Sequence, residues 1–257
     1  MDCLIAQLLR SLDGREVITI PYLLTKTAKY GYHRAMEVVL DMREYHITCI
    51  DIESSAHTSG WEKGNPCLAL LLTHQMSRAC ITQDVLDSLL YVASRTSNIG
   101  HVRTLIDRGA HVAPSGNRGV TPLHCCMFSP EILHMLLSVP GRKEHTVTAD
   151  VFGKNPLHMA AAANDYECAS LLLENCPDVR GMLHQRTFDG NIPLDSVFFR
   201  QMSRLTSAAP VECARRFDRT LAVFIEAYLR FPGGALFTWS VLSRKPWATD
   251  FDQHMQQ

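Results

Sequence analysis

Apolar side chains recur at helical spacing in several short segments of the chain. In residues 217–230 they fall at intervals of three and four: Leu221, Phe224, Ile225, Tyr228 and Leu229. This spacing places them on one face of a helix. The same pattern predicts helices over residues 23–30, 34–42, 86–97, 130–137 and 166–174, and a further helix from residue 99 that ends at Gly109. The pattern therefore predicts an all-α fold.

One polar phrase between these helices occurs twice with little change. Residues 119–124 are Gly-Val-Thr-Pro-Leu-His and residues 153–158 are Gly-Lys-Asn-Pro-Leu-His, so Pro156 follows Pro122 by 34 residues. Proline suits the first turn of a helix, because the N–H that it lacks would have no partner within the helix. Each phrase therefore predicts the start of a short helix, over 123–128 and over 157–164.

Weaker copies of the phrase extend the repeat in both directions. Residues 189–195 form a third copy, with Pro193 lying 37 residues after Pro156, and predict a helix over 195–204. Upstream, residues 64–70 form a degenerate copy, and the helix pair within 23–42 precedes it. These copies predict five or six repeats, with the clearest part at residues 98–194.

A Gly-x-Thr-Pro-Leu-His phrase at a period of about 33 residues resembles the ankyrin repeat. The resemblance implies an all-α solenoid of five or six helix-turn-helix repeats with helical caps, in which each repeat covers the apolar face of its neighbour. Residues 1–20 are expected to form an N-terminal helical cap and residues 21–230 the stack, with an insertion near 206–210. Residues 231–257 are expected to form a C-terminal cap, with a recognition tail as the alternative. The residues that match the family's structural motif are Thr121, Pro122, Leu123, His124, Pro156, Leu157, His158, Pro193 and Leu194.

The resemblance also implies a function, a non-enzymatic module that binds a partner protein through the concave face of the stack. The family pattern places these residues on that face: Arg118, Phe128, Phe152, Lys154, Phe188, Asn191, Phe199 and Arg200. For each phenylalanine the alternative is packing onto a neighbouring turn. The alternative function is a bacterial or viral effector delivered to a host cell, in which the repeats recruit a host target and the C-terminal segment has a separate activity.

Composition narrows the choice of partners. The chain has 25 Lys and Arg against 26 Asp and Glu, so no global charge favours nucleic acid or an anionic membrane. No apolar run approaches the roughly 20 residues that span a bilayer, and the first residues lack the basic character of a secretory signal. The nine cysteines are an odd number and are scattered, which favours reduced thiols in a cytoplasmic setting, the host cytoplasm for a delivered effector.

The sequence gives little evidence of catalysis or of metal or cofactor binding. His124 and His158 belong to the repeat phrase, where the resemblance implies that they tie neighbouring turns together. A Cys-His nucleophile pair can be drawn from many combinations, but no local signature of a cysteine hydrolase accompanies any of them. No phosphate-binding loop, nucleophile elbow or kinase signature occurs. We therefore expect no catalytic residues, no metal and no cofactor.

Overall fold

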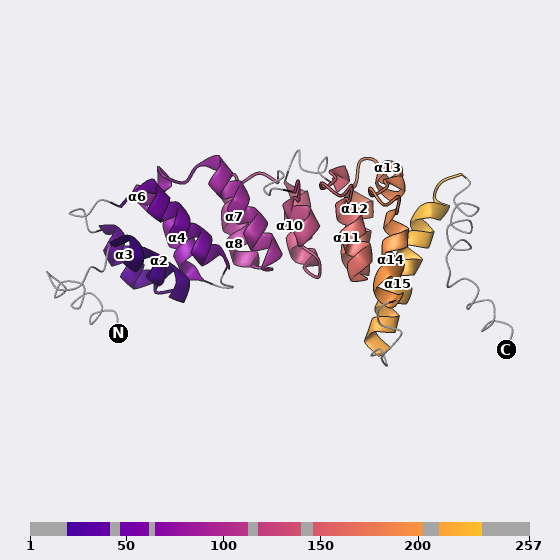
Figure 1. Cartoon of the computed structure of the whole chain (residues 1–257), viewed down its shortest axis with the longest axis horizontal. Helices are drawn as coiled ribbons and strands as arrows, with labels where there is room; N and C mark the ends of the chain where they lie inside the picture. Colours follow the sequence, from indigo (N-terminus) through magenta and orange to yellow (C-terminus); the bar gives the residue numbers. More distant parts are fainter. Residues whose placement is uncertain are drawn as a thin grey trace. The chain divides into compact units, whose positions relative to one another are not determined.

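The computed structural model describes residues 20–41, 47–61, 65–112, 118–139, 146–202 and 211–232. Within these ranges the regular elements are helices and none is a strand, which confirms the all-α prediction (Figure 1). The chain separates into two compact units, residues 1–117 and 118–257, a division that the sequence does not predict. The predicted N-terminal cap, the insertion near 206–210 and almost all of the predicted C-terminal cap or tail lie outside the described residues.

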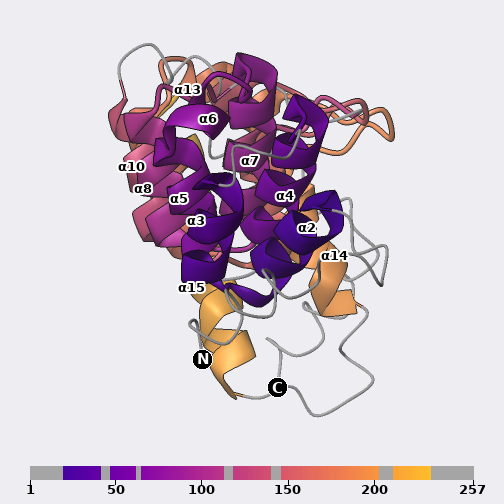
Figure 2. The same cartoon turned by 90° about the vertical axis from the view of Figure 1, so that its left-hand side faces the viewer.

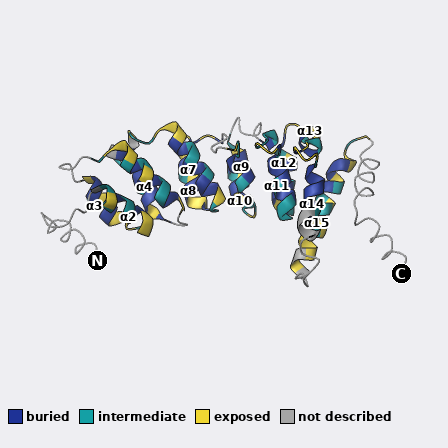
Figure 3. Cartoon of the chain, in the orientation of Figure 1, coloured by how far each residue is buried: buried dark blue, intermediate teal, exposed yellow. Residues whose placement is uncertain are grey.

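The first unit consists of helix pairs arranged in two rows. Its described helices are α2 (Ile20–Tyr30), α3 (His33–Asp41), α4 (Cys49–Trp61), α5 (Pro66–Thr73), α6 (Gln75–Arg78), α7 (Gln83–Arg95) and α8 (Ile99–Asp107). Helices α2, α4 and α7 pack side by side in one row, and α3, α5 and α8 in the other (Figure 2). The core lies between the rows, where one face of each helix is buried (Figure 3).

Helix α5 differs from its predicted place. Residues 64–70 are a degenerate copy of the phrase that opens a first helix, but Pro66 begins the second helix of a pair. Asn65 caps this helix by accepting a 2.9 Å hydrogen bond from the Cys67 N–H, and His101 Nε2 at the start of α8 lies 2.6 Å from the Asn65 carbonyl. An Asn-Pro start suits any helix, so it does not distinguish the two rows. The first helix of this pair is α4, which the sequence pattern did not predict.

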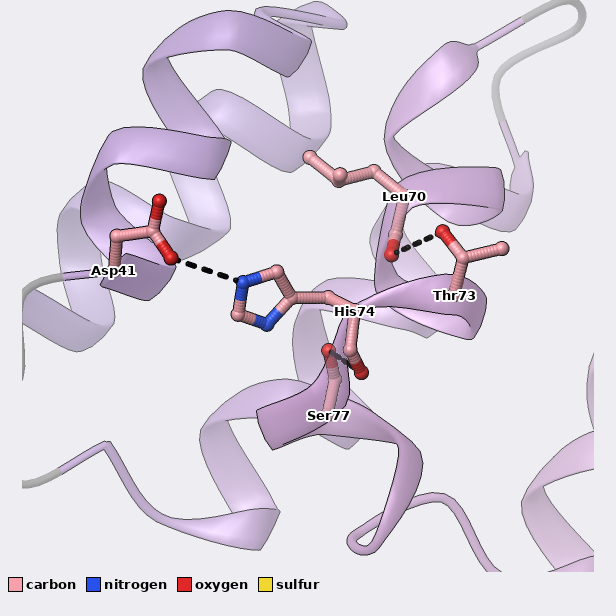
Figure 4. A network of polar contacts seen from close by, with 5 residues as sticks. All are labelled: Asp41, Leu70, Thr73, His74 and Ser77. Carbon is pink, nitrogen blue, oxygen red and sulfur yellow. Dashed lines mark hydrogen bonds and ion pairs between the residues drawn. The ribbon is translucent and has the colours of Figure 1, made fainter.

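A histidine joins the end of α3 to the end of α5. His74 Nε2 lies 3.3 Å from Asp41 Oδ1, and the His74 carbonyl accepts a 3.5 Å hydrogen bond from the Ser77 hydroxyl of α6 (Figure 4). The Thr73 hydroxyl donates a 3.1 Å hydrogen bond to the Leu70 carbonyl, so both groups in the last turn of α5 have a hydrogen-bond partner. These contacts fix the short helix α6 against the end of the α3–α5 pair.

The expectation of reduced thiols rather than disulfides is wrong for one pair of cysteines. Cys49, at the start of α4, forms a disulfide with Cys80, which follows α6. Their Cα atoms lie 4.8 Å apart, within the range that a disulfide bridges. A separation of 31 residues gives no sign of this contact in the sequence. The other described cysteine side chains are free thiols: Cys67, Cys125, Cys126, Cys168 and Cys176.

The second unit repeats the two-row arrangement. Its described helices are α9 (Pro122–Cys125), α10 (Pro130–Ser138), α11 (Pro156–Ala163), α12 (Tyr166–Asn175), α13 (Val179–His184), α14 (Pro193–Met202) and α15 (Val211–Leu229). Helices α9, α11 and α14 form the row of first helices, and α10, α12 and α15 form the row of second helices. Each repeat phrase thus opens a first helix, with Leu123, Leu157 and Leu194 fully buried.

Helix α9 is shorter than predicted, helix α13 was not predicted, and helix α15 begins at Val211 rather than at residue 217. Helix α9 ends at Cys125 rather than at residue 128, because Phe128 has a φ of 61° and Ser129 precedes Pro130, a position that disfavours helical backbone. The longer connection between the second and third phrases contains the short helix α13. The Leu183 carbonyl of α13 accepts a 2.7 Å hydrogen bond from the buried Tyr228 hydroxyl, which anchors α15 to the unit.

Candidate functional site

Turns project in front of the first helices of the second unit. We call residues 118–120, 150–154 and 187–191 the finger turns; they precede α9, α11 and α14. The second turn is closed by a 2.8 Å hydrogen bond from the Asp150 N–H to the Lys154 carbonyl. The third is closed in the same way from Thr187 to Asn191 at 2.9 Å. These two turns therefore have the same backbone path.

A polar side chain at the first position holds each closed turn. The Asp150 carboxylate accepts hydrogen bonds from the N–H groups of Phe152 at 2.9 Å and of Lys154 at 2.8 Å. At the matching position of the next turn, the Thr187 hydroxyl accepts from the Asn191 N–H at 3.2 Å. Asp and Thr commonly stabilise turns in this way. Sequence analysis missed both residues, although each lies three residues before the glycine of its phrase.

Backbone hydrogen bonds join successive finger turns. The Val151 N–H donates to the Arg118 carbonyl at 2.9 Å, and the Phe188 N–H donates to the Phe152 carbonyl at 3.0 Å. Gly153 has a φ of 77°, and a Cβ atom added there would lie 3.0 Å from the Arg186 carbonyl oxygen. Only glycine combines this left-handed backbone with so close an approach. The three turns are thus fixed in register with one another.

The histidines of the repeat phrase reinforce the same connection. His124 Nδ1 accepts from the Thr121 N–H at 3.1 Å, and its Nε2 lies 3.0 Å from the Lys154 carbonyl of the next turn. His158 repeats this arrangement, with Nε2 3.3 Å from the Asn191 carbonyl. Because Nδ1 accepts a hydrogen bond, the hydrogen-bond network assigns the ring proton to Nε2, which donates to the carbonyl. Each imidazole therefore connects its own helix start to the following finger turn.

The third phrase carries Asp195 where the first two carry histidine. Its carboxylate accepts a 2.9 Å hydrogen bond from the Ile192 N–H, so it caps α14 as the histidines cap α9 and α11. A carboxylate has no second ring nitrogen to donate onward. Asp195 therefore keeps the local cap but cannot donate a hydrogen bond to the next turn as the imidazoles do.

Burial keeps both histidines neutral. It lowers the pKa of His124, and it lowers the pKa of His158 to about 4, against smaller opposing effects that include the hydrogen bond to Asn191. Desolvation disfavours the charged form of a base, and this is the larger effect at both sites. The imidazoles act as neutral structural connectors rather than as acid–base groups near pH 7.

The finger turns expose two large aromatic side chains. Phe152 is 47% exposed and Phe188 is 83% exposed, so neither ring is packed into the core. The Arg118 guanidinium lies 5.7 Å from the centroid of the Phe152 ring. Arg186 donates a 2.7 Å hydrogen bond to the Gly190 carbonyl and so lies along the third turn. Aromatic and cationic groups thus alternate along the linked turns.

Phe128, which was predicted to share the binding face, does not lie on the finger turns. It is 52% exposed, but it sits in the connection between α9 and α10, and its N–H donates a 2.5 Å hydrogen bond to Asp165 at the far end of α11. Helix α11 has eight residues, which corresponds to a length of about 12 Å. The Arg216 guanidinium of α15 lies 5.4 Å from the Phe128 ring centroid. Phe128 therefore belongs to the opposite end of the helix pairs from the finger turns.

The remaining predicted partner-binding residues divide into two groups. Lys154 and Asn191 lie on the finger turns and are half-buried, and their carbonyls are used by the histidines of the preceding phrases. Phe199 and Arg200 fall within α14, but their side chains lie outside what the structure describes. The site that the structure assembles consists of Arg118, Phe152, Lys154, Phe188 and Asn191, with Arg186 beside them.

No arrangement typical of metal chemistry was found in the described part of the chain: groups of three or more His, Cys, Asp or Glu side chains close enough to hold an ion do not occur there. Burial also raises the pKa of the Cys126 and Cys168 thiols, so both remain protonated. A protonated, buried thiol is a poor nucleophile.

Comparison with known families bears on this site directly. The family model described as "Ankyrin repeat" matches residues 152–181, which run from the second finger turn through α11 and α12 into α13. No curated protein matches the chain. The chain contains an ankyrin repeat over these residues, which confirms the resemblance that the Pro-Leu-His phrases indicated. Separately, none of the helices in the described ranges combines the length and the apolar character needed to cross a membrane.

Proposed function

We propose that this protein is a protein-interaction module that binds a partner through the finger turns of its second unit. The observation that supports this most strongly is the pair of exposed rings, Phe152 and Phe188, on turns joined by a backbone hydrogen bond. Exposed aromatic side chains are costly to leave in water and commonly anchor protein interfaces. Ankyrin repeats suggest this class of function in general.

The turns offer a rigid surface of defined chemistry. The second and third turns are closed by backbone hydrogen bonds and held by Asp150 and Thr187, and all three turns are joined in sequence, so little conformational entropy is lost on binding. The Arg118 guanidinium lies 5.7 Å from the centroid of the Phe152 ring, Lys154 belongs to the second turn, and Arg186 lies along the third. The partner that fits this surface presents apolar side chains flanked by Asp or Glu.

The proposal extends to the architecture and the setting of the module. Its helix pairs are ankyrin-type repeats of a solenoid with five or six members, and it has no chemistry of its own. The buried, protonated Cys126 and Cys168 thiols support a cytoplasmic setting, whereas the Cys49–Cys80 disulfide counts against it.

Site-specific photo-crosslinking tests the location of the interface. A photoreactive phenylalanine analogue is placed at position 152 or at position 188 of the full chain, and irradiation is carried out in cells. The matched control carries the same analogue at position 174, an exposed site on the second helix α12. The proposal predicts the same covalent partner from positions 152 and 188, and none from position 174. Adducts that form equally from all three positions, or only from position 174, would refute it.

A further inference from the structure

Helix α2 of the first unit presents an unusual exposed face. We call Tyr22, Lys26, Lys29, Tyr30 and Tyr32 the α2 stripe. Residues 22, 26, 29 and 30 follow helical spacing and share one side of α2, and Tyr32 follows the turn at Gly31. The opposite side of the helix carries Leu24, Thr27 and Ala28, all buried. The stripe is therefore the outward face of a helix whose inner face is already packed.

Aromatic rings and ammonium groups of the stripe contact one another. Tyr22, Tyr30 and Tyr32 are 53%, 56% and 49% exposed. Lys26 Nζ lies 5.0 Å from the centroid of the Tyr22 ring, and Lys29 Nζ lies 5.7 Å from that of Tyr30. The Tyr30 and Tyr32 rings lie 5.9 Å apart. These contacts hold flexible lysines against rigid rings, which gives the stripe a defined shape.

The stripe has a local positive charge although the whole chain has a formal charge of −1. Residues 17–36 contain no Asp or Glu. Among the described residues, no ion pair within 4.0 Å joins Lys26 or Lys29 to a carboxylate.

Three of the four carboxylates on α3 and α4, the helices packed against α2, interact with other groups. Asp51 of α4 accepts hydrogen bonds from the Thr48 N–H and hydroxyl at 2.9 and 2.6 Å. Glu53 interacts with His57 of its own helix, and Asp41 of α3 pairs with His74. Glu37 of α3 is exposed. Neither lysine of the stripe is thus paired with a carboxylate of the described residues, and each can bind one from a partner.

We propose that the α2 stripe binds an acidic segment of a partner protein, with Asp or Glu carboxylates on the two ammonium groups and apolar side chains between the tyrosine rings. The tyrosine hydroxyls add donors for the same carboxylates. This surface belongs to the first unit and is distinct from the finger turns, so it does not depend on the function proposed for them. It gives the protein a second binding surface with a chemistry of its own.

The contacts within the stripe favour an acidic peptide over a single-stranded nucleic acid. Nucleic-acid bases bind such surfaces by stacking on free aromatic faces. Here the ammonium groups of Lys26 and Lys29 already lie over the rings of Tyr22 and Tyr30, so a base would have to displace them. A carboxylate approaches the same ammonium groups without that displacement.

Fluorescence anisotropy with a synthetic probe tests the proposal on the full chain. The probe is a short labelled peptide in which Glu-Glu pairs alternate with single leucines, and its control has Gln in place of Glu. One variant carries Lys26→Glu and Lys29→Glu, and a second carries Tyr22→Ala and Tyr30→Ala. The matched charge control carries Arg103→Glu on α8 and Arg108→Glu at the C-cap of α8, in the same unit. Circular dichroism melts check that each variant is folded.

We expect both stripe variants to weaken binding of the glutamate probe by at least about tenfold, and the α8 control to change it less than about twofold. Hydrogen exchange of the unmodified protein with the probe bound should slow at residues 22–32, a result that does not require any variant to fold. Equal binding of the glutamine peptide, equal loss in the α8 control, or unchanged exchange at 22–32 would overturn the proposal. Tighter, lysine-dependent binding of oligothymidylate or of phosphatidylserine vesicles would overturn the assignment of the occupant.

Discussion

The backbone N–H of Phe188 donates a 3.0 Å hydrogen bond to the backbone carbonyl of Phe152. Chains joined in this way lie about 5 Å apart, as neighbouring strands do. The bond therefore places two exposed aromatic residues side by side on turns that belong to successive repeats. The surface that carries the proposed function is thus set by main-chain geometry, which makes it sensitive to changes in the turns themselves.

Replacing Gly153 should test that geometry. Gly153→Ala forces a side chain into left-handed backbone and brings its Cβ to 3.0 Å from the Arg186 carbonyl oxygen. Gly190→Ala is the matched control, because Gly190 has a φ of 79° but no atom within 4 Å of an added Cβ. We expect Gly190→Ala to cost about 1 kcal/mol of unfolding free energy and Gly153→Ala at least about 1 kcal/mol more. Urea denaturation measures both; equal losses would show that the turns are not in close contact.

The sequence predicted the parts of this fold that depend on local signals. Proline at the first turn and an apolar residue after it locate the starts of α9, α11 and α14, because these preferences act within one helix turn. The resemblance to the family placed Phe152 and Phe188 on these turns but left open whether each ring packs onto a neighbouring turn, and the structure shows both side chains exposed. Local signals of this kind are strongest in residues 98–194.

Features set by contacts across the fold were not predictable in the same way. Helix α4 contains several Ser and Thr residues and no repeat phrase, and it is held by packing against α2 and α7. The row to which α5 belongs depends on its neighbours rather than on its Asn-Pro start. Phe128 has helical neighbours in the sequence, but the approach to Pro130 ends the helix and moves its side chain to the opposite end of the repeat. The Cys49–Cys80 disulfide likewise follows from how the helices meet.

Asp165 should contribute more to stability than an ordinary helix cap. Its buried carboxylate accepts from the Cys168 N–H at 3.2 Å and also from the Phe128 N–H of the preceding helix pair. Asp165→Ala leaves both donors without this acceptor, and we expect a loss of about 2 to 3 kcal/mol in unfolding free energy. Asp178→Ala removes an exposed cap that serves only Gly181 at 2.8 Å, and should cost about 1 kcal/mol. Similar losses in denaturant melts would contradict the bridging role of Asp165.

Stability should fall below neutral pH because of the buried histidines. The pKa of His158 is about 4 in the folded protein against 6.5 for the free side chain, so between these values the unfolded state binds a proton that the folded state does not. The free energy of unfolding therefore keeps its full value above pH 6.5 and declines as the pH falls toward 4. His158 alone lowers it by about 2 kcal/mol at pH 5. Lowered pKa values at His101 and His124 act in the same direction.

Melting curves across this pH range check the contribution of His158. His158→Gln should reduce the slope of stability against pH between 7 and 5, in addition to any loss at neutral pH from its missing hydrogen bonds. The exposed His134 on α10 provides the control for replacing a histidine, and His134→Gln should leave the melting temperature at pH 7 nearly unchanged. An unchanged slope in the His158 variant would show that this residue is not the source of the pH dependence.

The most direct test of the proposed function uses a double variant, Phe152→Ala with Phe188→Ala. Calorimetry measures its affinity for the partner that crosslinks to positions 152 and 188, and thermal melts measure its stability. Because both rings are exposed, the account predicts a loss of at least about 30-fold in affinity with an almost unchanged melting temperature. A control with Glu131→Ala and Glu174→Ala, both exposed on second helices of the same unit, should bind as the unmodified protein does. A double variant that is stable and binds with unchanged affinity, or one that unfolds because the rings belong to the core, would contradict the account.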